Sequence, residues 1–280
     1  MVLLALDFGD NTYAWDSPTV ICLLVFGAVA VGIFTFNETK VRNPVIPLRL
    51  FSTLSTSATY VVFSLNSFTL IGLTYYLPLY SQSVLGADAL QSGLHLLPII
   101  IGSSLSAALT GLIIQRTGRY LELMYVAQVL TIVGVGLLIS LDFDQDLPKL
   151  LGFQVIVGVG VGMNIEPPLI AAQASMTVTD TAAVVATMGF SRSIATAISV
   201  VIGGVLFQNE MAAGNDRLQN ELGSDTASLF NGAVAAENVE IIGTLPEDQR
   251  PLVREAYFWA LRSVWVMVCN PLSILSLLQC

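Results

Sequence analysis

Three long stretches of this sequence contain no charged side chain: residues 50–87, 89–115 and 123–141. A bilayer core about 30 Å thick is crossed by roughly 20 apolar residues in a helix, so each stretch is long enough to span a membrane. Only 11% of the 280 residues are charged, against about 25% in an average globular protein. The sequence therefore predicts an all-α polytopic membrane protein rather than a large soluble helical protein.

Hydropathy predicts about seven transmembrane helices along the chain. The predicted spans are Pro18–Phe36, Leu54–Tyr80, Leu94–Ile114, Leu121–Leu141, Leu150–Ala172, Ala182–Phe207 and Tyr257–Leu278. The segment 210–255 is too acidic to enter a membrane, and we expect it to be partly helical. Tyr75, Tyr76 and Tyr80 fall at a predicted span boundary, where an aromatic belt is expected.

The basic residues of the short loops predict the orientation. The loop at 37–53 carries three Lys or Arg side chains and the loop at 115–120 carries two, whereas the loop at 142–149 has three Asp against one Lys. Loops rich in Lys and Arg stay on the cytoplasmic side. The segment 210–255 is therefore expected to be extracellular or lumenal, and the C-terminus cytoplasmic.

Composition and motifs argue against several classes of function. A net charge of −9 disfavours nucleic acid as a partner. Cys22, Cys269 and Cys280 show neither a disulfide framework nor metal-ligand spacing, so no metal and no cofactor is expected. The sequence has no phosphate-binding loop of the G-x-x-x-x-G-K-[ST] type, and it assembles no catalytic nucleophile, base or metal cluster. We therefore predict neither an enzyme nor a nucleotide-driven pump.

Three predicted spans carry stripes of small and polar residues at helical spacing. The stripes consist of Ser103, Ala107 and Gly111 in the third span, Gln154, Gly158, Gly162 and Glu166 in the fifth, and Gly189, Arg192, Thr196, Ser199 and Gly203 in the sixth. Such stripes serve close helix packing, or they line a cavity when they carry ionisable groups, which are costly in lipid. The candidates for a substrate or proton pathway are Glu166, Arg192, Gln154, Asn164 and Thr196.

Glu166 lies in the run NIEPPLIAAQ and allows three interpretations. It forms a buried ion pair with Arg192 of the next span, because depths counted at 1.5 Å per residue along continuous helices put the two residues about 9 Å apart, within reach of two long side chains. Alternatively, it is a protonatable site whose pKa is raised by burial and lowered by a nearby Arg. In the third interpretation it meets interfacial water because Pro167 and Pro168 end the helix early.

The run GLIIQRTGRY resembles the cytoplasmic loop signature of the major facilitator superfamily through Gly111, Arg116, Gly118 and Arg119, although Gln115 stands where the signature has an acidic residue. Longer runs resemble the fourteen-span drug:proton antiporters of the fungal multidrug and toxin efflux type. These runs are YYLPLYSQSVLGADALQSGLHLLP, FQVIVGVGVGMNIEPPLIAAQA and ATMGFSRSIATAISVVIGGVLFQNEM.

The resemblance implies a proton-coupled efflux transporter of amphipathic organic compounds such as drugs or toxins. Counted on that family, the chain corresponds to the last seven of fourteen spans. Residues 1–53 would hold an extracellular segment, a linker helix and a basic cytoplasmic loop, and residues 54–280 the C-terminal six-helix bundle with an acidic extracellular loop at 210–255.

The partners implied are the lipid bilayer, a small amphipathic substrate, protons and an N-terminal bundle from the same gene or a second chain. The chain is then expected to be a fragment, in the plasma membrane rather than the vacuolar membrane. The alternative is a non-transporting half-bundle, either a remnant or a partner or regulator of a full transporter.

Overall fold

The computed structural model describes residues 1–2, 4–5, 16–41, 48–51, 54–143, 146–174, 176 and 180–278. Two loop residues used for the predicted orientation, Arg42 and Asp144, lie outside the described residues, as does much of the predicted N-terminal segment.

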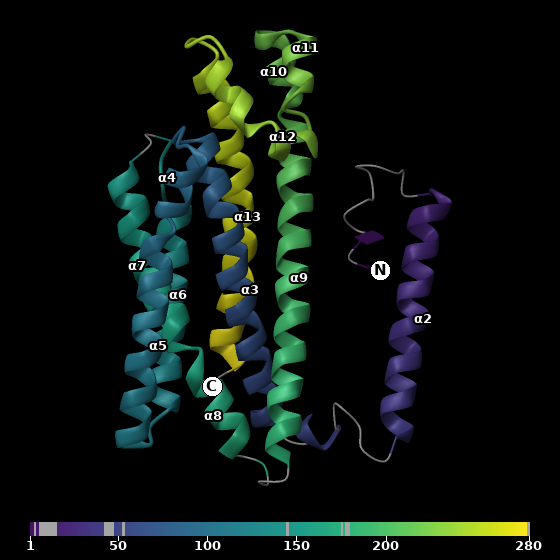
Figure 1. The fold of residues 1–280 in the computed structure, drawn as a ribbon, viewed down its shortest axis with the longest axis vertical. Coiled ribbons are helices and arrows are strands. Elements are labelled where there is room, and N and C mark those ends of the chain that lie inside the picture. The colour runs from purple at the N-terminus through teal and green to yellow at the C-terminus, as the bar shows by residue number, and fades with distance from the viewer. Residues whose placement is uncertain are drawn as a thin grey trace.

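All regular structure in the described residues is helical (Figure 1). The elements are α2 (Pro18–Lys40), η1 (Leu48–Phe51), α3 (Leu54–Ser83), α4 (Ala89–Leu94), α5 (Leu97–Thr117), α6 (Leu121–Ile139), α7 (Leu147–Met163), α8 (Glu166–Ala174), α9 (Thr181–Ala213), α10 (Asn215–Leu222), α11 (Ser224–Ser228), α12 (Val234–Glu237), η3 (Val239–Thr244) and α13 (Arg250–Leu278).

Local sequence explains where several helices begin and end. Ser17 and Asp88 accept hydrogen bonds from the backbone N–H groups of Val20 (3.3 Å) and Gln91 (2.7 Å), as N-cap residues do. Asp146 caps α7 in the same way, and its hydrogen bond with the Lys149 side chain lowers the pKa of the Asp146 carboxyl. The α5 helix ends at Gly118, which adopts a left-handed conformation (φ 67°) that favours glycine.

The predicted all-α membrane fold is confirmed. In the described part of the chain, six helical segments are long and apolar enough to cross a membrane. They coincide with the first six predicted spans. The seventh, α13, covers the predicted span Tyr257–Leu278 but begins earlier, at Arg250. The predicted fifth span differs because it consists of two helices, α7 and α8, separated at residues 164–165.

The six-helix part consists of two groups of three helices (Figure 1). The first group is α5, α6 and α7, with α7 packed against both of the others. The second group is α3, α9 and α13, in which each helix contacts the other two. Contacts of α6 with α13, and of α3 with α7 and α8, join the groups into one bundle.

The α2 helix lies apart from this bundle (Figure 1). Its ring contact with the bundle joins Phe34 to Phe190 of α9, with centroids 6.0 Å apart. Only 11% of the most apolar 18-residue stretch of α2 is buried. A helix that is apolar all round and so little covered by protein is typical of one surrounded by lipid.

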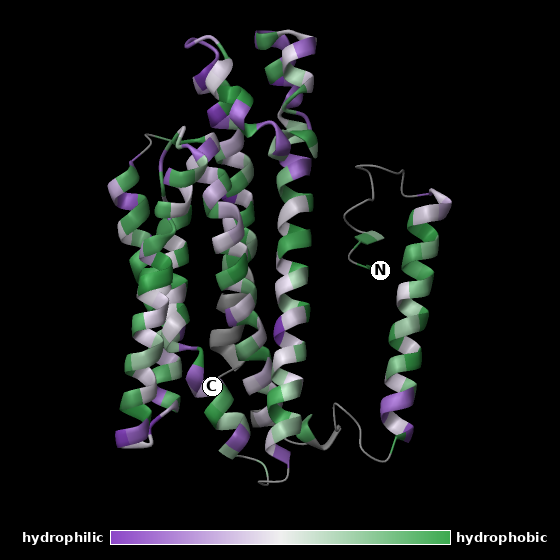
Figure 2. Cartoon of the chain, viewed as in Figure 1, coloured by the Kyte–Doolittle hydropathy of each residue, from purple (hydrophilic) through white to green (hydrophobic). Residues whose placement is uncertain are grey.

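The outward faces of α5 and α6 are also apolar. Leu105, Leu109, Val129 and Val133 are exposed on these two helices, and the hydrophobic colouring continues along their length (Figure 2). Large exposed apolar surfaces are rare on soluble proteins. Such an exposed apolar face is typical of helices that pack against lipid.

The segment predicted to be an acidic loop forms a compact helical cap, which we define as residues 215–244. At 1.5 Å per residue, the 33 residues of α9 reach about 50 Å, well beyond a 30 Å hydrocarbon core. The cap packs where α9 and α13 extend past the other helices (Figure 1). Its buried side chains, including Leu218, Phe230 and Ile242, belong to the same hydrophobic core as the bundle.

Tyr257 of α13 anchors the cap. Its hydroxyl donates a buried hydrogen bond to the carbonyl of Ala235 (2.6 Å), and its ring contacts Phe207 of α9 and Phe230 of the cap. We expect Tyr257→Phe to lower the free energy of unfolding by about 1–2 kcal/mol, because the buried carbonyl loses its partner. The measurement is the melting temperature of the purified chain in detergent.

Tyr75→Phe serves as the matched control, because Tyr75 is 58% exposed. It should leave the melting temperature unchanged. Equal melting temperatures for Tyr257→Phe and the unchanged chain would show that the Tyr257 hydroxyl does not hold the cap.

The predicted aromatic belt is wrong for two of its three members. Tyr76 and Tyr80 are 3% and 2% exposed, and only Tyr75 faces outward. The Tyr80 ring packs on Trp265 of α13, with centroids 5.0 Å apart. The α3 helix lies between other helices, so Tyr76 and Tyr80 meet protein rather than the lipid interface.

Candidate functional site

Glycine allows the closest helix contact in the bundle, between α5 and α7. A Cβ atom on Gly158 would lie 2.6 Å from the carbonyl oxygen of Ile99, and one on Gly162 would lie 2.2 Å from that of Ser103. These two members of the stripe in the fifth span are therefore packing residues. Small residues at such contacts let two helix backbones approach each other.

Gln154 lies one turn before Gly158 and is completely buried. Within the described residues, neither its amide nitrogen nor its amide oxygen has a hydrogen-bond partner. A buried carboxamide that lacks partners is unfavourable by about 1–3 kcal/mol for each group, and such groups mark sites of function or ordered water. Gln154 therefore remains a candidate for a polar pathway.

The break between α7 and α8 is the second polar feature. The backbone N–H groups of Asn164 and Ile165 bond three residues back, to Val161 and Gly162, at 3.2 Å each. Asn66 of α3 donates its side-chain amide to the carbonyls of Val161 (3.1 Å) and Asn164 (3.3 Å). A broken helix is tolerated inside a membrane when neighbouring groups satisfy the freed backbone in this way.

The sequence analysis did not single out Asn66, which supports the helix break. The available signal was that Asn66 is one of only two carboxamides, with Gln82, in the charge-free stretch 50–87. The side chain of Asn164, which was predicted as a pathway candidate, is 1% exposed and has no hydrogen-bond partner within the described part of the chain. The break thus gathers two carboxamides from α3 and α7 in an apolar bundle.

The two prolines begin a helix rather than end one. Pro167 and Pro168 lie in the first turn of α8, where a missing N–H group is not needed. The α7 helix has already ended at Met163. The prediction that the two prolines end the helix is therefore wrong. Glu166 is the first residue of a new helix, and it is half-buried.

The structure does not bring Glu166 and Arg192 together as an ion pair. No salt bridge joins them among the side chains that the structure describes. The predicted depth of Glu166 assumed one continuous helix from residue 150 to residue 172. The break at residues 164–165 instead makes Glu166 the first residue of a separate helix, α8. In this conformation the ion-pair interpretation is wrong.

Arg192 lies on the stripe of small and polar residues of α9, which is buried against α3 in one half and exposed in the other. Farther along, the hydroxyl of Ser199 donates to the Phe68 carbonyl of α3 (2.8 Å), and Gly203 lies under the ring of Tyr76. Nearer the start of α9, Arg192 is exposed. Thr196 is half-buried, and its hydroxyl bonds to the Arg192 carbonyl at 2.7 Å. One half of the stripe is a packing face and the other half is open.

A groove of about 480 Å³ continues along the α3–α9 contact toward the cap. Its walls include Tyr75, Tyr76 and Gln82 from α3, and Gln208 from α9. The Tyr76 hydroxyl donates to the carbonyl of Val200 at 2.5 Å. Aromatic rings beside a few carboxamides are typical of pockets for small amphipathic ligands, and the sequence analysis had assigned no such role to these residues.

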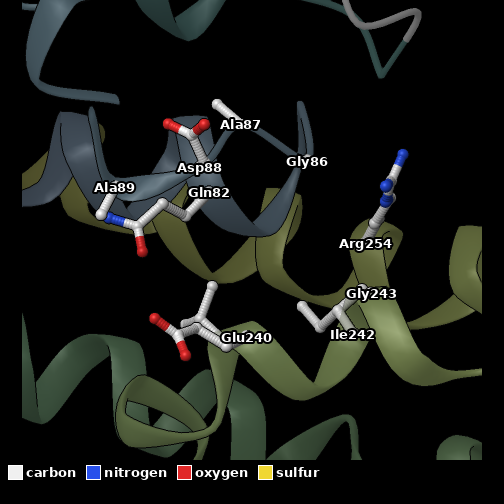
Figure 3. A pocket seen from close by; sticks show the side chains of 10 residues that line it. Gln82, Gly86, Ala87, Asp88, Ala89, Glu240, Ile242, Gly243 and Arg254 are labelled. Carbon is white, nitrogen blue, oxygen red and sulfur yellow. The ribbon is translucent and has the colours of Figure 1, made fainter. Parts of the chain in front are cut away.

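A smaller pocket of about 260 Å³ separates the cap from the turn between α3 and α4. Gln82 of α3 and Glu240 of η3 face each other across it (Figure 3). Arg254 of α13 lies against Gly86, whose φ is 71° and whose added Cβ would be 2.5 Å from the guanidinium. This close fit attaches the cap side of α13 to the α3–α4 turn.

The loop motif lies at the opposite end of the bundle, between α5 and α6. Arg116 is in the last turn of α5 and Gly118 is its C-cap. Arg119 pairs with Glu122 at 3.7 Å, with both side chains mostly exposed, and such exposed pairs contribute at most about 1 kcal/mol. Gly111 has no atom within 4 Å of an added Cβ, so packing does not explain its identity.

Metal ligands are not clustered in this site. Across the described ranges, no group of three or more His, Cys, Asp or Glu side chains could hold an ion. The chemistry available comes from carboxamides, tyrosines, Glu166 and Arg192. Such groups can bind a small molecule and exchange a proton.

The known proteins to which this chain is similar are membrane transporters. The profile of the Major Facilitator Superfamily matches residues 2–200. The chain is 44% identical to the efflux pump dotC of Dothistroma septosporum, over 95% of this chain and 46% of the pump. It is 37% identical to the MFS-type transporter ppz2 of Metarhizium majus, again over 95% of this chain and 46% of the relative. It is 32% identical to the aspyridones efflux protein of Neocamarosporium betae, over 100% of this chain and 49% of that protein. The chain thus spans about half the length of the curated relatives it matches.

Proposed function

This chain belongs to the major facilitator superfamily, and from that premise we propose that it forms one bundle of a secondary transporter that exports small amphipathic organic compounds. Superfamily members of this kind hold substrate between two pseudo-symmetric halves and alternate access by moving one half against the other. A chain that spans 46% of an efflux pump would supply one of these halves. The other half would come from the same gene or from a second chain.

The observation that carries the proposal is the open face of α9. Arg192 is exposed in a helix apolar enough to span a membrane. A charged side chain at the centre of a bilayer costs about 2.5–3.5 kcal/mol on insertion scales and usually faces a bundle interior or a water-filled cavity. We therefore assign this face of α9 to a cavity that a second bundle would close.

The α3–α9 groove supports the substrate class. Tyr75 and Tyr76 offer aromatic faces, whereas Gln82 and Gln208 offer carboxamides. These groups suit a ligand with an apolar body and a few hydrogen-bonding groups. The names of the relatives, which include an aspyridones efflux protein, support organic compounds of this kind.

Proton coupling is assigned to Glu166, with Arg192, Gln154, Asn164 and Thr196 along the pathway. A proton that crosses 100 mV releases about 2.3 kcal/mol, enough for roughly fifty-fold accumulation of a neutral solute. The α7–α8 break next to Glu166, and Pro78 within α3, are the points at which these helices can bend. We place the transporter in the plasma membrane rather than the vacuolar membrane.

A chimera tests the proposed function. The chain replaces the half of the Dothistroma pump that it matches, and the chimera is expressed in yeast that lacks its own drug efflux pumps. We expect the chimera to lower the accumulation of amphipathic fluorescent dyes several-fold, and the chain alone to insert without lowering it. A protonophore should abolish the difference.

Two outcomes would contradict the proposal. A chimera that reaches the membrane and folds but transports no dye would favour a non-transporting half-bundle. Proton-dependent efflux by the chain alone would show that a second bundle is not required. Membrane fractionation and size-exclusion chromatography supply the expression controls.

The proposed orientation makes a separate prediction. With the native cysteines replaced by serine, a cysteine at Thr117 near the basic loop should react with a membrane-impermeant maleimide only after the membrane is permeabilised. A cysteine at Asp225 in the cap should react in intact cells. The reason is the excess of basic residues in the loops on the Thr117 side. Labelling in the reverse order would place the cap in the cytoplasm.

A further inference from the structure

A third pocket opens between α9, α10 and α13, on the side of α9 that faces away from the α3–α9 groove. It measures about 290 Å³ and is lined by charged, aromatic and small residues, among them Glu210, Arg217 and Trp259. Glu210 and Arg217 lie seven residues apart and therefore on one face of the helix that continues from α9 into α10. The pocket thus offers a negative group at one end and a positive group at the other, with the indole ring of Trp259 in its wall.

The depth of the pocket matches the edge of a bilayer. Residues 200–207 of α9 contain only apolar side chains and glycine, and Gln208, Asn209 and Glu210 follow them, which marks the edge of the hydrocarbon region. Glu210 accepts a hydrogen bond from Ser263 of α13 (3.1 Å), so the two helices cross this level together. The seven residues from Glu210 to Arg217 cover about 10 Å, which is comparable to the headgroup layer of one leaflet.

A stacked pair of an aromatic and a basic residue on α13 lies at this level. Trp259 is 50% exposed, and the guanidinium of Arg262 stacks over its ring with 5.0 Å to the ring centroid. Arg262 is three residues farther into the bilayer than Trp259, so its side chain extends back toward the interface. Below this level, Val266 of α13 and Ile202 of α9 are exposed apolar residues. They offer a surface for an acyl chain directly under the charged pocket.

We propose that this pocket binds the headgroup of a phosphatidylethanolamine molecule in the leaflet on the cap side. The Glu210 carboxylate accepts hydrogen bonds from the protonated primary amine, and the Arg217 guanidinium binds the phosphodiester. Arg217 is available for this contact because its side chain is 61% exposed even while it pairs with Glu255 at 3.2 Å. A zwitterionic lipid fits better than an anionic one because the pocket holds both signs of charge. The primary amine is required because a trimethylated amine has no N–H group to donate.

Native mass spectrometry of the purified full chain tests this assignment. The delipidated chain in detergent is titrated with dioleoyl forms of phosphatidylethanolamine, phosphatidylcholine and phosphatidylglycerol. We expect phosphatidylethanolamine to bind about tenfold more tightly than phosphatidylcholine, because one charge-assisted hydrogen bond contributes on this scale. Glu210→Gln, which still accepts the bond from Ser263, should remove this preference and leave phosphatidylcholine binding unchanged. Arg217→Gln should weaken both zwitterionic lipids.

Glu221→Gln is the matched control, because Glu221 is an exposed acid on α10 that does not line the pocket. It should change none of the three affinities, and melting temperatures confirm that all variants are folded. Equal binding of the two zwitterionic lipids by the unchanged chain would overturn the proposal. So would the tightest binding of phosphatidylglycerol, or an equal loss for all lipids in Glu210→Gln.

Discussion

Gly162→Ala should sharply reduce the yield of folded chain. The added methyl group would lie 2.2 Å from both the Ser103 carbonyl oxygen and the Ser106 hydroxyl of α5. A backbone carbonyl cannot rotate away as a flexible side chain can, so α5 and α7 must separate. Overpacking costs about 1–3 kcal/mol and occasionally more, and we expect the upper end here. The measurements are the monodisperse fraction in detergent and the melting temperature.

Gly152→Ala on the same helix supplies the matched control. An added Cβ at Gly152 has no atom within 4 Å, and alanine favours a helix over glycine by up to about 1 kcal/mol. The same chemical change should therefore stabilise the chain at position 152 and destabilise it at position 162. Equal melting temperatures for the two variants would show that the α5–α7 contact is looser than the structure has it.

Glu166→Gln should abolish proton-dependent efflux by the chimera while leaving its expression unchanged. The substitution keeps the size and hydrogen-bonding capacity of the side chain but removes its protonation. Glu166 makes no ion pair with Arg192 in the described part of the chain, so folding should not depend on its charge. We expect at least a tenfold loss of the efflux rate and the loss of its dependence on pH. The measurement is dye efflux at a series of external pH values.

The double variant Glu166→Gln with Arg192→Gln distinguishes a static ion pair from independent roles. When one partner of a buried ion pair is removed, the cost is about 3–5 kcal/mol, whereas the removal of both can be nearly neutral. Because the structure separates the two residues, we expect no rescue in the double variant. A recovery of expression and efflux would show that Glu166 and Arg192 pair in another state of the transport cycle. An unchanged rate in Glu166→Gln alone would make Glu166 a structural residue of the α8 start.

The features that the sequence alone determined are those that depend on local composition. Hydropathy located the seven long helical segments found in the part of the chain that the structure describes, because the energy of a span depends on the apolar character of about 20 consecutive residues and little on its neighbours. The end of α5 at Gly118 also depends on local sequence alone, because it requires one residue that adopts a left-handed backbone conformation. The family resemblance likewise followed from the order of short runs along the chain.

Other features depend on which helix lies next to which. The glycines at 158 and 162 are packing residues because α5 lies against them, whereas Gly111 and Gly189, in similar stripes, have no atom within 4 Å of an added Cβ. Spacing along one helix cannot distinguish these cases. Tyr76 and Tyr80 were expected at the lipid interface, but the position of α3 between other helices buries them.

The helix break at residues 164–165 and the separation of Glu166 from Arg192 were likewise decided by tertiary structure. Depths counted along the sequence assume a continuous helix, and the break is tolerated because Asn66 of a distant helix satisfies the carbonyls there. The cap folds for the same kind of reason. Its acidic surface predicted exposure to water, but its order depends on Tyr257 and on the core that it shares with α9 and α13. Contacts between residues far apart in sequence have no local signal, so only the assembled bundle determines them.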